Sequence, residues 1–238
     1  MFKLNEGLIA YLCTEGAHPL VLFGSLFVVL LTAYLLGSIN SAILFSKLVY
    51  RDDIRKHGSG NGGMTNMLRT FGGKAALLTL AGDLLKTALA IFIAGVVFGF
   101  NYVAGLSVSG YCYVAGLFAV LGHIFPLYYR FKGGKGVLVT STMALILTPV
   151  AFLILFCIFA AIVATSKYVS LGSVSVAVLY PVLLHGMFAV MFESPMPGLV
   201  ALSTIALACL IVWCHRKNLE RISNRTESKL SFGKKKDE

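Results

Sequence analysis

Long apolar stretches constrain this chain more than any other feature of its sequence. A helix needs about 20 apolar residues to cross the roughly 30 Å hydrocarbon layer of a bilayer. Of the 238 residues, 58% are hydrophobic and only 13% are charged, which is too few polar residues to cover a soluble domain. We therefore predict an all-α, polytopic membrane protein. The expected spans are about Leu20–Phe45, Ala75–Phe100, Tyr102–Tyr129, Val137–Thr165, Val174–Phe192 and Leu199–Trp213.

The formal net charge of +10 comes from basic residues between and after these stretches. Segments 47–74 and 130–135 and the tail after Trp213 are rich in Lys and Arg, whereas 100–102 and 193–198 carry almost no charge. Cytoplasmic loops collect basic residues, so this pattern indicates orientation rather than a nucleic-acid partner. We place the N-terminus outside and segment 47–74 inside.

One stretch must turn back if the basic tail is also to lie inside. Val137–Thr165 is long, and Pro149 in its middle removes a helix hydrogen bond and disturbs the preceding turn. A break there gives seven transmembrane helices with the C-terminus cytoplasmic. The chain is then a single membrane domain, residues 1–238, with a basic cytoplasmic tail at 215–238. The segment before Leu20 lacks a signal-peptide pattern, so we expect Leu20 onward to be a retained span.

The first inside loop, His57–Arg69, is rich in glycine and hydrogen-bond donors. Glycines let the backbone approach a ligand closely, and successive N–H groups form an anion-binding nest. A helix start near Thr65 would direct its positive dipole end at the same place, and Arg69 suits a phosphate. The alternative is a flexible loop with helix caps. The candidate ligand-binding residues are Ser59, Gly60, Asn61, Thr65, Asn66 and Arg69.

The second inside loop contains Lys132-Gly133-Gly134-Lys135-Gly136 before an apolar helix. This segment resembles a phosphate cradle, but it lacks the spacing and the Ser/Thr of a nucleotide P-loop, so we do not predict ATP binding. The alternative is a positive turn between two helices.

Two weaker signals lie further along. Ser170 and Ser173 lie in the third inside loop, Ser166–Ser173, and they either contact substrate or cap a helix. His215 and Asn218 are three residues apart, so they share a face if the last helix continues. The alternative is a basic helix end with an incidental histidine. Asp83 and Lys86, inside a span, are expected to form a structural ion pair; the alternative is that they orient the first inside loop.

Several kinds of catalytic motif are absent from the sequence. There is no GxSxG elbow, no HExxH and no cluster of metal ligands, so we predict neither a cofactor nor a metal. What remains is cationic, donor-rich chemistry suited to phosphate. A transporter or channel for an organic phosphate would need similar loops, but such proteins bind near the midplane and often contain repeats, and none is visible here.

Taken together, these motifs resemble the bacterial acyl-phosphate:glycerol-3-phosphate acyltransferases, the PlsY family. The resemblance covers nearly the whole chain, with departures at Asn40, Met64 and Gly72-Gly73. The matching segments are Gly37–Ile39, Gly58–Asn61, Thr65-Asn66, Arg69, Gly122-His123, Phe125-Pro126, Phe131–Val137, Ser170-Leu171, Ser173, His215-Arg216, Asn218, Glu227 and Lys229.

The resemblance implies a seven-helix fold in the bacterial inner membrane with its active site at the cytoplasmic face. It implies transfer of a fatty acyl group from acyl phosphate to the sn-1 hydroxyl of glycerol 3-phosphate, releasing phosphate. Membrane lipid surrounds the enzyme, and no obligate protein partner is expected. We expect catalytic roles for Ser59, Asn61, Arg69, Lys132 and His215, and substrate binding by Gly60, Thr65, Asn66, Gly133, Gly134, Lys135, Gly136, Ser170, Ser173 and Asn218.

The charges suggest how these residues divide between two phosphate-bearing substrates. Arg69, Ser59, His215 and Asn218 would hold glycerol 3-phosphate. The turn 132–136, with Asn61, Thr65 and Asn66, would hold the acyl phosphate. Either the donor's own phosphate or His215 would accept the hydroxyl proton, and we leave both open here.

Overall fold

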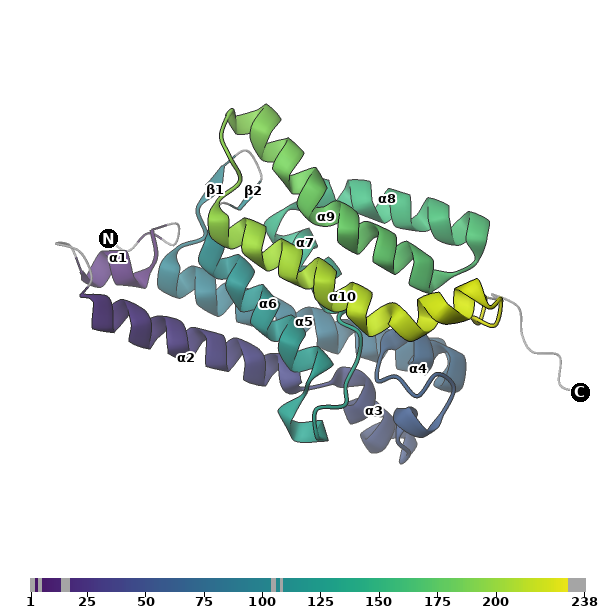
Figure 1. Ribbon diagram of the computed structural model, residues 1–238. Helices are drawn as coiled ribbons and strands as arrows, with labels where there is room; N and C mark the ends of the chain where they lie inside the picture. Colours follow the sequence, from purple (N-terminus) through teal and green to yellow (C-terminus); the bar gives the residue numbers. More distant parts are fainter. Residues whose placement is uncertain (1–2, 4–5, 14–17, 104–105, 108, 231–238) are drawn as a thin grey trace, which may run out of the picture.

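The computed structural model describes residues 3, 6–13, 18–103, 106–107 and 109–230. Among these residues, six helices are long and apolar enough to cross a membrane. They lie roughly side by side along the long axis of the molecule (Figure 1). These helices are α2 (Pro19–Ser38), α5 (Gly73–Phe98), α6 (Gly110–Ile124, extended by the 3-10 turn η2 at Leu127–Tyr129), α8 (Pro149–Ser166), α9 (Val169–Phe192) and α10 (Gly198–Ser223).

The remaining helices and strands are shorter. The last of them, α7, is an apolar helix too short to count as a full span. They are α1 (Leu8–Leu12), α3 (Ser41–Tyr50), the 3-10 turn η1 (Ile54–Lys56), α4 (Met64–Phe71), the antiparallel strands β1 (Tyr102–Val103) and β2 (Leu106–Ser107), and α7 (Val137–Leu147).

Small residues allow α2 and α6 to pack backbone to backbone. A Cβ atom added at Gly37 would lie 2.2 Å from the carbonyl oxygen of Ala119, and one at Gly122 would lie 2.2 Å from that of Tyr34. Such close approaches are how helices associate where lipid removes the hydrophobic drive to cluster. Large apolar side chains such as Phe23 and Phe27 instead lie on the exposed surface of α2, where they suit a hydrocarbon solvent.

The break expected at Pro149 is confirmed. Helix α7 ends at Leu147, and α8 begins at Pro149. Proline lacks an N–H, but a residue in the first turn of a helix has no helical partner for that group, so no hydrogen bond is lost. The hydroxyl of Thr148 donates to the carbonyl of Ala144, satisfying a group at the end of α7. The structure confirms a mainly helical protein with six helices long and apolar enough to span a membrane within the described residues, whereas the seven-span count and the orientation of the termini remain predictions.

Two expected spans were wrong in extent. The stretch Leu20–Phe45 is divided at Ile39, because the Asn40 side chain accepts a hydrogen bond from the N–H of Ile43 and so begins α3. The stretch Tyr102–Tyr129 does not begin as a helix, because Gly99 and Asn101 adopt positive φ and direct the chain into the β1–β2 hairpin.

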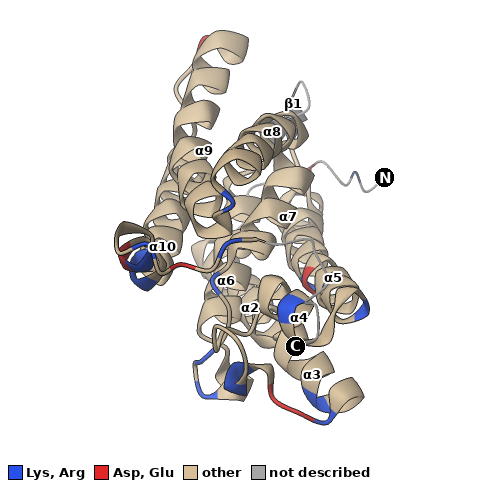
Figure 2. Ribbon diagram, turned by 90° about the vertical axis from the view of Figure 1, so that its right-hand side faces the viewer, with Lys and Arg blue, Asp and Glu red and all other residues tan. Residues whose placement is uncertain are grey.

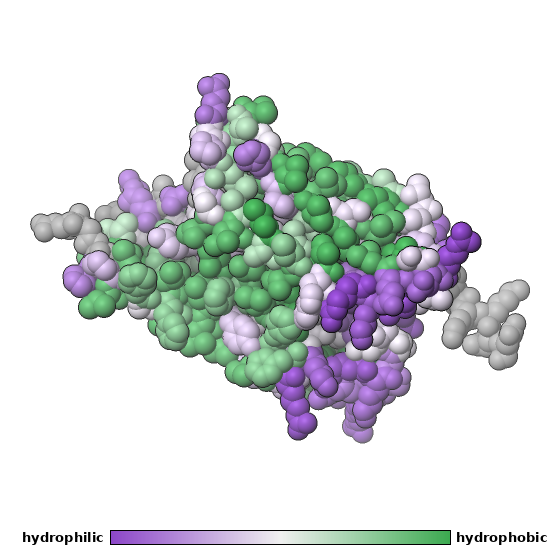
Figure 3. Space-filling view, viewed as in Figure 1, coloured by the Kyte–Doolittle hydropathy of each residue, from purple (hydrophilic) through white to green (hydrophobic). Residues whose placement is uncertain are grey.

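Charged side chains gather at one end of the bundle. Figure 2 looks toward this end, where Lys and Arg lie on α3, α4, the last turns of α10 and the connecting loops. Figure 3 shows the same division as a hydrophilic cap beside a broad apolar side surface. Helix α10 continues well past the expected end at Trp213, so the first residues of the predicted tail are helical; the lysine run 234–236 lies outside the described residues.

Candidate active site

A single cavity of about 920 Å³ connects the charged end of the molecule to its apolar interior. Its polar end is formed by the loop before α4, the start of α7, the last turns of α10 and the segment after α10. Its apolar part lies among α7, α8 and α9, where the walls include Leu145, Phe152, Phe156, Val176 and Ala177. A molecule with an anionic head and a hydrocarbon tail fits this division.

Asn66 holds the glycine-rich loop together. Its side-chain oxygen accepts a hydrogen bond from the Ser59 N–H at 3.1 Å. Its side-chain nitrogen lies within hydrogen-bonding distance of the carbonyls of Ile54, His57 and Asn61, at 3.0–3.2 Å. The hydrogen-bond donors and the acceptor of the Asn66 side-chain amide are therefore engaged with the loop to which Asn66 belongs. Asn66 lines the cavity and these contacts give its side chain a positioning role, while its predicted binding of substrate stays a prediction.

A second asparagine joins the two glycine-rich loops. The buried Asn40 side chain donates to the carbonyl of Gly62 at 3.0 Å, in addition to capping α3. The N–H of Gly62 in turn donates to the carbonyl of Gly133 at 3.4 Å. Asn40, noted above as a departure from the family pattern, therefore connects the break between α2 and α3 to both candidate phosphate loops.

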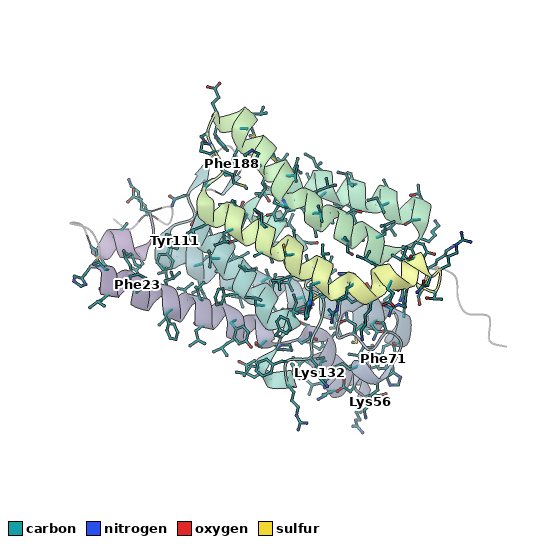
Figure 4. All side chains as sticks on the ribbon, in the orientation of Figure 1. Phe23, Lys56, Phe71, Tyr111, Lys132 and Phe188 are labelled. Carbon is teal, nitrogen blue, oxygen red and sulfur yellow. The ribbon has the colours of Figure 1, made fainter. Side chains whose placement is uncertain are left out.

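The second loop turns its two lysines in different directions. Lys135 lines the cavity and is partly buried. Lys132 is exposed on the loop between α6 and α7, where Figure 4 labels it, and it does not line the cavity. Its carbonyl accepts a hydrogen bond from Arg55 at 3.4 Å. The sequence predicted a catalytic role for Lys132 and substrate binding for Lys135, and only Lys135 lines the cavity.

Lys135 belongs to a polar network that spans three elements. Its ammonium donates to the side-chain oxygen of Asn218 on α10. The Asn218 amide nitrogen donates to Ser170 Oγ at 2.9 Å and to Glu227 Oε1 at 2.7 Å. Burial lowers the pKa of Lys135 to about 8, although the nearby Glu227 carboxylate partly opposes this shift. The site therefore contains a cation that loses its charge at mildly alkaline pH.

The segment after α10 folds back over the cavity. Glu227 accepts a 2.7 Å hydrogen bond from Ser170 and forms a 2.7 Å ion pair with Arg221. Burial raises the pKa of Glu227, but hydrogen bonds from Ser170, Arg221 and Asn218 outweigh it and hold the pKa below its usual value. Arg69 donates to the carbonyl of Ser228 at 3.4 Å. The segment 215–238 was predicted to be a basic cytoplasmic tail that contributes His215 and Asn218 to the site. Arg221 and Glu227, which also line the cavity, were not among the predicted site residues.

His215 is buried against the same cavity. Its Nδ1 lies 2.8 Å from the carbonyl oxygen of Ile211, one turn earlier on α10. A carbonyl can only accept, so Nδ1 carries the hydrogen and Nε2 of the neutral ring keeps a lone pair. The predicted helical pairing of His215 with Asn218 is confirmed, because both are buried on one face of α10 and line the cavity.

The cavity brings together most of the residues that the sequence proposed. Ser173 lines it, although its hydroxyl donates to the carbonyl of Val169 in its own helix. Gly60, Lys132, Gly133 and Gly134 do not line it. Within the described ranges, no group of three His, Cys, Asp or Glu side chains is arranged to hold a metal ion. The predicted residues that line the cavity are Ser59, Asn61, Thr65, Asn66, Arg69, Lys135, Gly136, Ser170, Ser173, His215 and Asn218.

Comparison with known proteins assigns the family. The family model described as glycerol-3-phosphate acyltransferase matches residues 27–225. Glycerol-3-phosphate acyltransferase of Geobacillus kaustophilus is 40% identical over 204 residues, covering 86% of this chain and 95% of that protein. The protein of the same name from Syntrophomonas wolfei is 41% identical over 202 residues, covering 85% and 95%.

Solved structures agree with the sequence comparison. One is the crystal structure of PlsY (YgiH), an integral membrane glycerol 3-phosphate acyltransferase, in its glycerol 3-phosphate form. It matches with a TM-score of 0.75 and 32% identity, covering 87% of this chain and 96% of that one. Its lysophosphatidic acid form has a TM-score of 0.73 and 31% identity. This chain therefore belongs to the glycerol-3-phosphate acyltransferase family.

Proposed function

We propose that this protein transfers a fatty acyl group from acyl phosphate to the sn-1 hydroxyl of glycerol 3-phosphate. The hydroxyl oxygen bonds to the acyl carbonyl carbon, the bond from that carbon to the phosphate oxygen breaks, and the products are lysophosphatidic acid and inorganic phosphate. The single observation that carries the proposal is the continuous cavity, which joins a cationic, donor-rich end to an apolar channel. The reaction would be the first step of bacterial phospholipid synthesis.

The polar end suits two anions that must meet. Arg69 and Lys135 supply positive charge, and Ser59, His215 and Asn218 supply neutral hydrogen-bonding groups; all five line the cavity. Charge-assisted hydrogen bonds to phosphate are about twice as strong as neutral ones. Glycerol 3-phosphate would bind Arg69, Ser59, His215 and Asn218. The phosphate of the donor would bind at Lys135 and Gly136, beside Asn61 and Thr65.

The apolar channel would hold the acyl chain of the donor and later that of the product. Phe152 and Phe156 on α8 and Val176 on α9 line this part of the cavity. Burying a methylene in such surroundings contributes about 0.8 kcal/mol. The chain would thereby fix the reacting carbonyl near the charged end.

Acyl phosphate is an activated mixed anhydride, so the reaction needs no covalent enzyme intermediate. Positioning of the two substrates and stabilisation of the oxyanion and the leaving phosphate would provide the catalysis. The Nε2 lone pair of His215 would accept a hydrogen bond from the glycerol hydroxyl. The hydroxyl proton would then pass to His215 or to a phosphate oxygen of the donor.

We also propose an orientation and a setting. The basic loops support an outside N-terminus and a cytoplasmic C-terminus, which would place the cavity mouth at the cytoplasmic face of the bacterial inner membrane. The reaction needs no cofactor, nucleic acid or obligate protein partner. The family membership favours this function over the transport of an organic phosphate.

The test uses purified protein in lipid, with palmitoyl phosphate and glycerol 3-phosphate and no added metal. We expect phosphate release that requires both substrates and is lost in Arg69→Ala. Lys56→Ala is the matched control, because Lys56 is an exposed cation that does not line the cavity. Absence of release from folded protein, together with movement of a phosphate ester across the vesicle membrane, would instead support a transporter.

A further inference from the structure

A buried charged cluster lies beside the cavity and has no part in the reaction as described so far. It consists of Asp83 and Lys86 on α5 and His123 on α6. The side chains of Asp83 and Lys86 are only 1% and 4% exposed, and that of His123 is 4% exposed. Ionisable groups within membrane spans are costly, and those that persist commonly serve a function. Asp83 and His123 also line the cavity, so the cluster is more than a distant structural pair.

The contacts of Lys86 fix the hydrogen on the His123 ring. Its ammonium group lies 2.7 Å from Asp83 Oδ1, 2.9 Å from the carbonyl of Ile39 and 3.0 Å from His123 Nδ1. An ammonium has three hydrogens to donate and no lone pair, so these three acceptors match its three donors. His123 Nδ1 must therefore accept, and the neutral imidazole carries its hydrogen on Nε2.

Further contacts hold the cluster rigidly. The hydroxyl of Ser41 donates to Asp83 Oδ1 at 2.9 Å. Ile39 lies at the end of α2, so its carbonyl has no partner in a following helical turn, and Lys86 satisfies it. The cluster thus connects the ends of α2 and α6 through α5, and it leaves the imidazole little freedom to rotate.

The His123 ring lies against the candidate phosphate turn. A Cβ atom added at Gly134 would be 2.0 Å from His123 Nε2, so only glycine allows this approach. The N–H of Gly134 also donates to the carbonyl of His123 at 3.0 Å. Within the described part of the chain, Nε2 has no hydrogen-bonding partner. The imidazole lines the cavity beside this turn, so an Nε2–H that the protein leaves unpaired is suited to donate to an anionic ligand.

We propose that His123 is a substrate-facing hydrogen-bond donor, held in the Nε2–H form by the Asp83–Lys86 pair, and that it binds an oxygen of the acyl phosphate. This inference rests on the proposed function and adds one residue to it. His215 shows the opposite arrangement, with a lone pair on Nε2. The two imidazoles therefore give the cavity one neutral donor and one neutral acceptor.

Two conservative variants separate donation from packing. The amide nitrogen of glutamine can replace Nε2–H, whereas asparagine reaches only the Nδ1 position. We expect His123→Asn to lose about tenfold to a hundredfold in kcat/KM for palmitoyl phosphate, because a hydrogen bond to a charged group is removed. We expect His123→Gln to retain activity within a few-fold. The KM for glycerol 3-phosphate should be unchanged in both. His185→Gln is the matched control, since His185 is exposed on α9 and does not line the cavity.

Equal losses of kcat/KM in the two variants, with thermal stability unchanged, would overturn the proposal. Wild-type kinetics in His123→Asn would also overturn it. So would a change in the KM for glycerol 3-phosphate with no change in the kinetics for palmitoyl phosphate. If His123→Asn does not fold, the nitrogen NMR spectrum of isotope-labelled wild-type protein shows which ring nitrogen of His123 carries the hydrogen. We expect hydrogen on Nε2 and a shift of that signal on adding palmitoyl phosphate. Hydrogen on Nδ1 would overturn this inference even in an active acyltransferase, whereas inactivity with both substrates would overturn the proposed function itself.

Discussion

The two lysines of the second loop provide a sharp test, because the sequence predicted a role at the site for both and only Lys135 lines the cavity. Lys135 lines the cavity and donates to Asn218, whereas Lys132 is exposed outside it. Replacing Lys135 by Met removes a charge-assisted hydrogen bond to phosphate, which contributes about 1.5–3 kcal/mol. We therefore expect Lys135→Met to lower kcat/KM for palmitoyl phosphate by about 10- to 150-fold. Lys132→Met should change it by no more than about threefold.

The pH dependence of Lys135 gives a second measurement on the same residue. Burial disfavours the charged ammonium and lowers its pKa to about 8, so the cation is present below that pH and lost above it. We expect kcat/KM to fall about tenfold per pH unit above about pH 8 as this one proton is lost. Lys135→Arg retains its charge and should move the alkaline decline to higher pH.

Steady-state kinetics from about pH 6 to pH 10, with palmitoyl phosphate varied and glycerol 3-phosphate saturating, measure both effects. An unchanged alkaline decline in Lys135→Arg would refute the assignment of that decline to Lys135. A larger loss in Lys132→Met than in Lys135→Met would refute the placement of the two side chains.

Other variants test the supporting contacts. Asn66→Ala removes the amide that holds the glycine-rich loop, so it should raise the KM for glycerol 3-phosphate at least tenfold in steady-state assays. An unchanged KM would contradict the positioning role of Asn66. Glu227→Gln should lower the thermal midpoint of the purified protein, because Arg221 then loses its ion-pair partner; an unchanged midpoint would mean that the segment over the cavity contributes little. Ala177→Phe should fill part of the apolar channel and shift donor preference toward shorter acyl phosphates, measured by competition between chain lengths; no shift would place the chain elsewhere.

The fold was predictable wherever hydropathy and backbone chemistry act locally. The apolar stretches identified the long helices, and Pro149 located the break between α7 and α8. The division of the first stretch at Asn40 was not predicted, because the short polar segment around it lies between two long apolar runs. That break depends on the side chain of Asn40, which caps α3 and reaches Gly62 in a distant loop.

The site was predictable as a set of loops but not as a set of roles. Residue type and spacing identified Arg69, His215 and Asn218, which line the cavity. They could not show that Lys132 lies outside the cavity and Lys135 lines it, because the direction of a side chain in a glycine-rich turn depends on tertiary contacts. They also missed the role of Glu227, since a carboxylate in a basic tail gives no local signal that it folds back onto Ser170.

The central claim is that one cavity brings acyl phosphate and glycerol 3-phosphate together, and the most direct measurement supplies the donor in two forms. Purified protein in lipid would receive radiolabelled glycerol 3-phosphate with either palmitoyl phosphate or palmitoyl-CoA, and lysophosphatidic acid and phosphate would be quantified. We predict equal amounts of lysophosphatidic acid and phosphate from palmitoyl phosphate, and no product from palmitoyl-CoA. Product from palmitoyl-CoA alone, or phosphate release without lysophosphatidic acid, would contradict the claim.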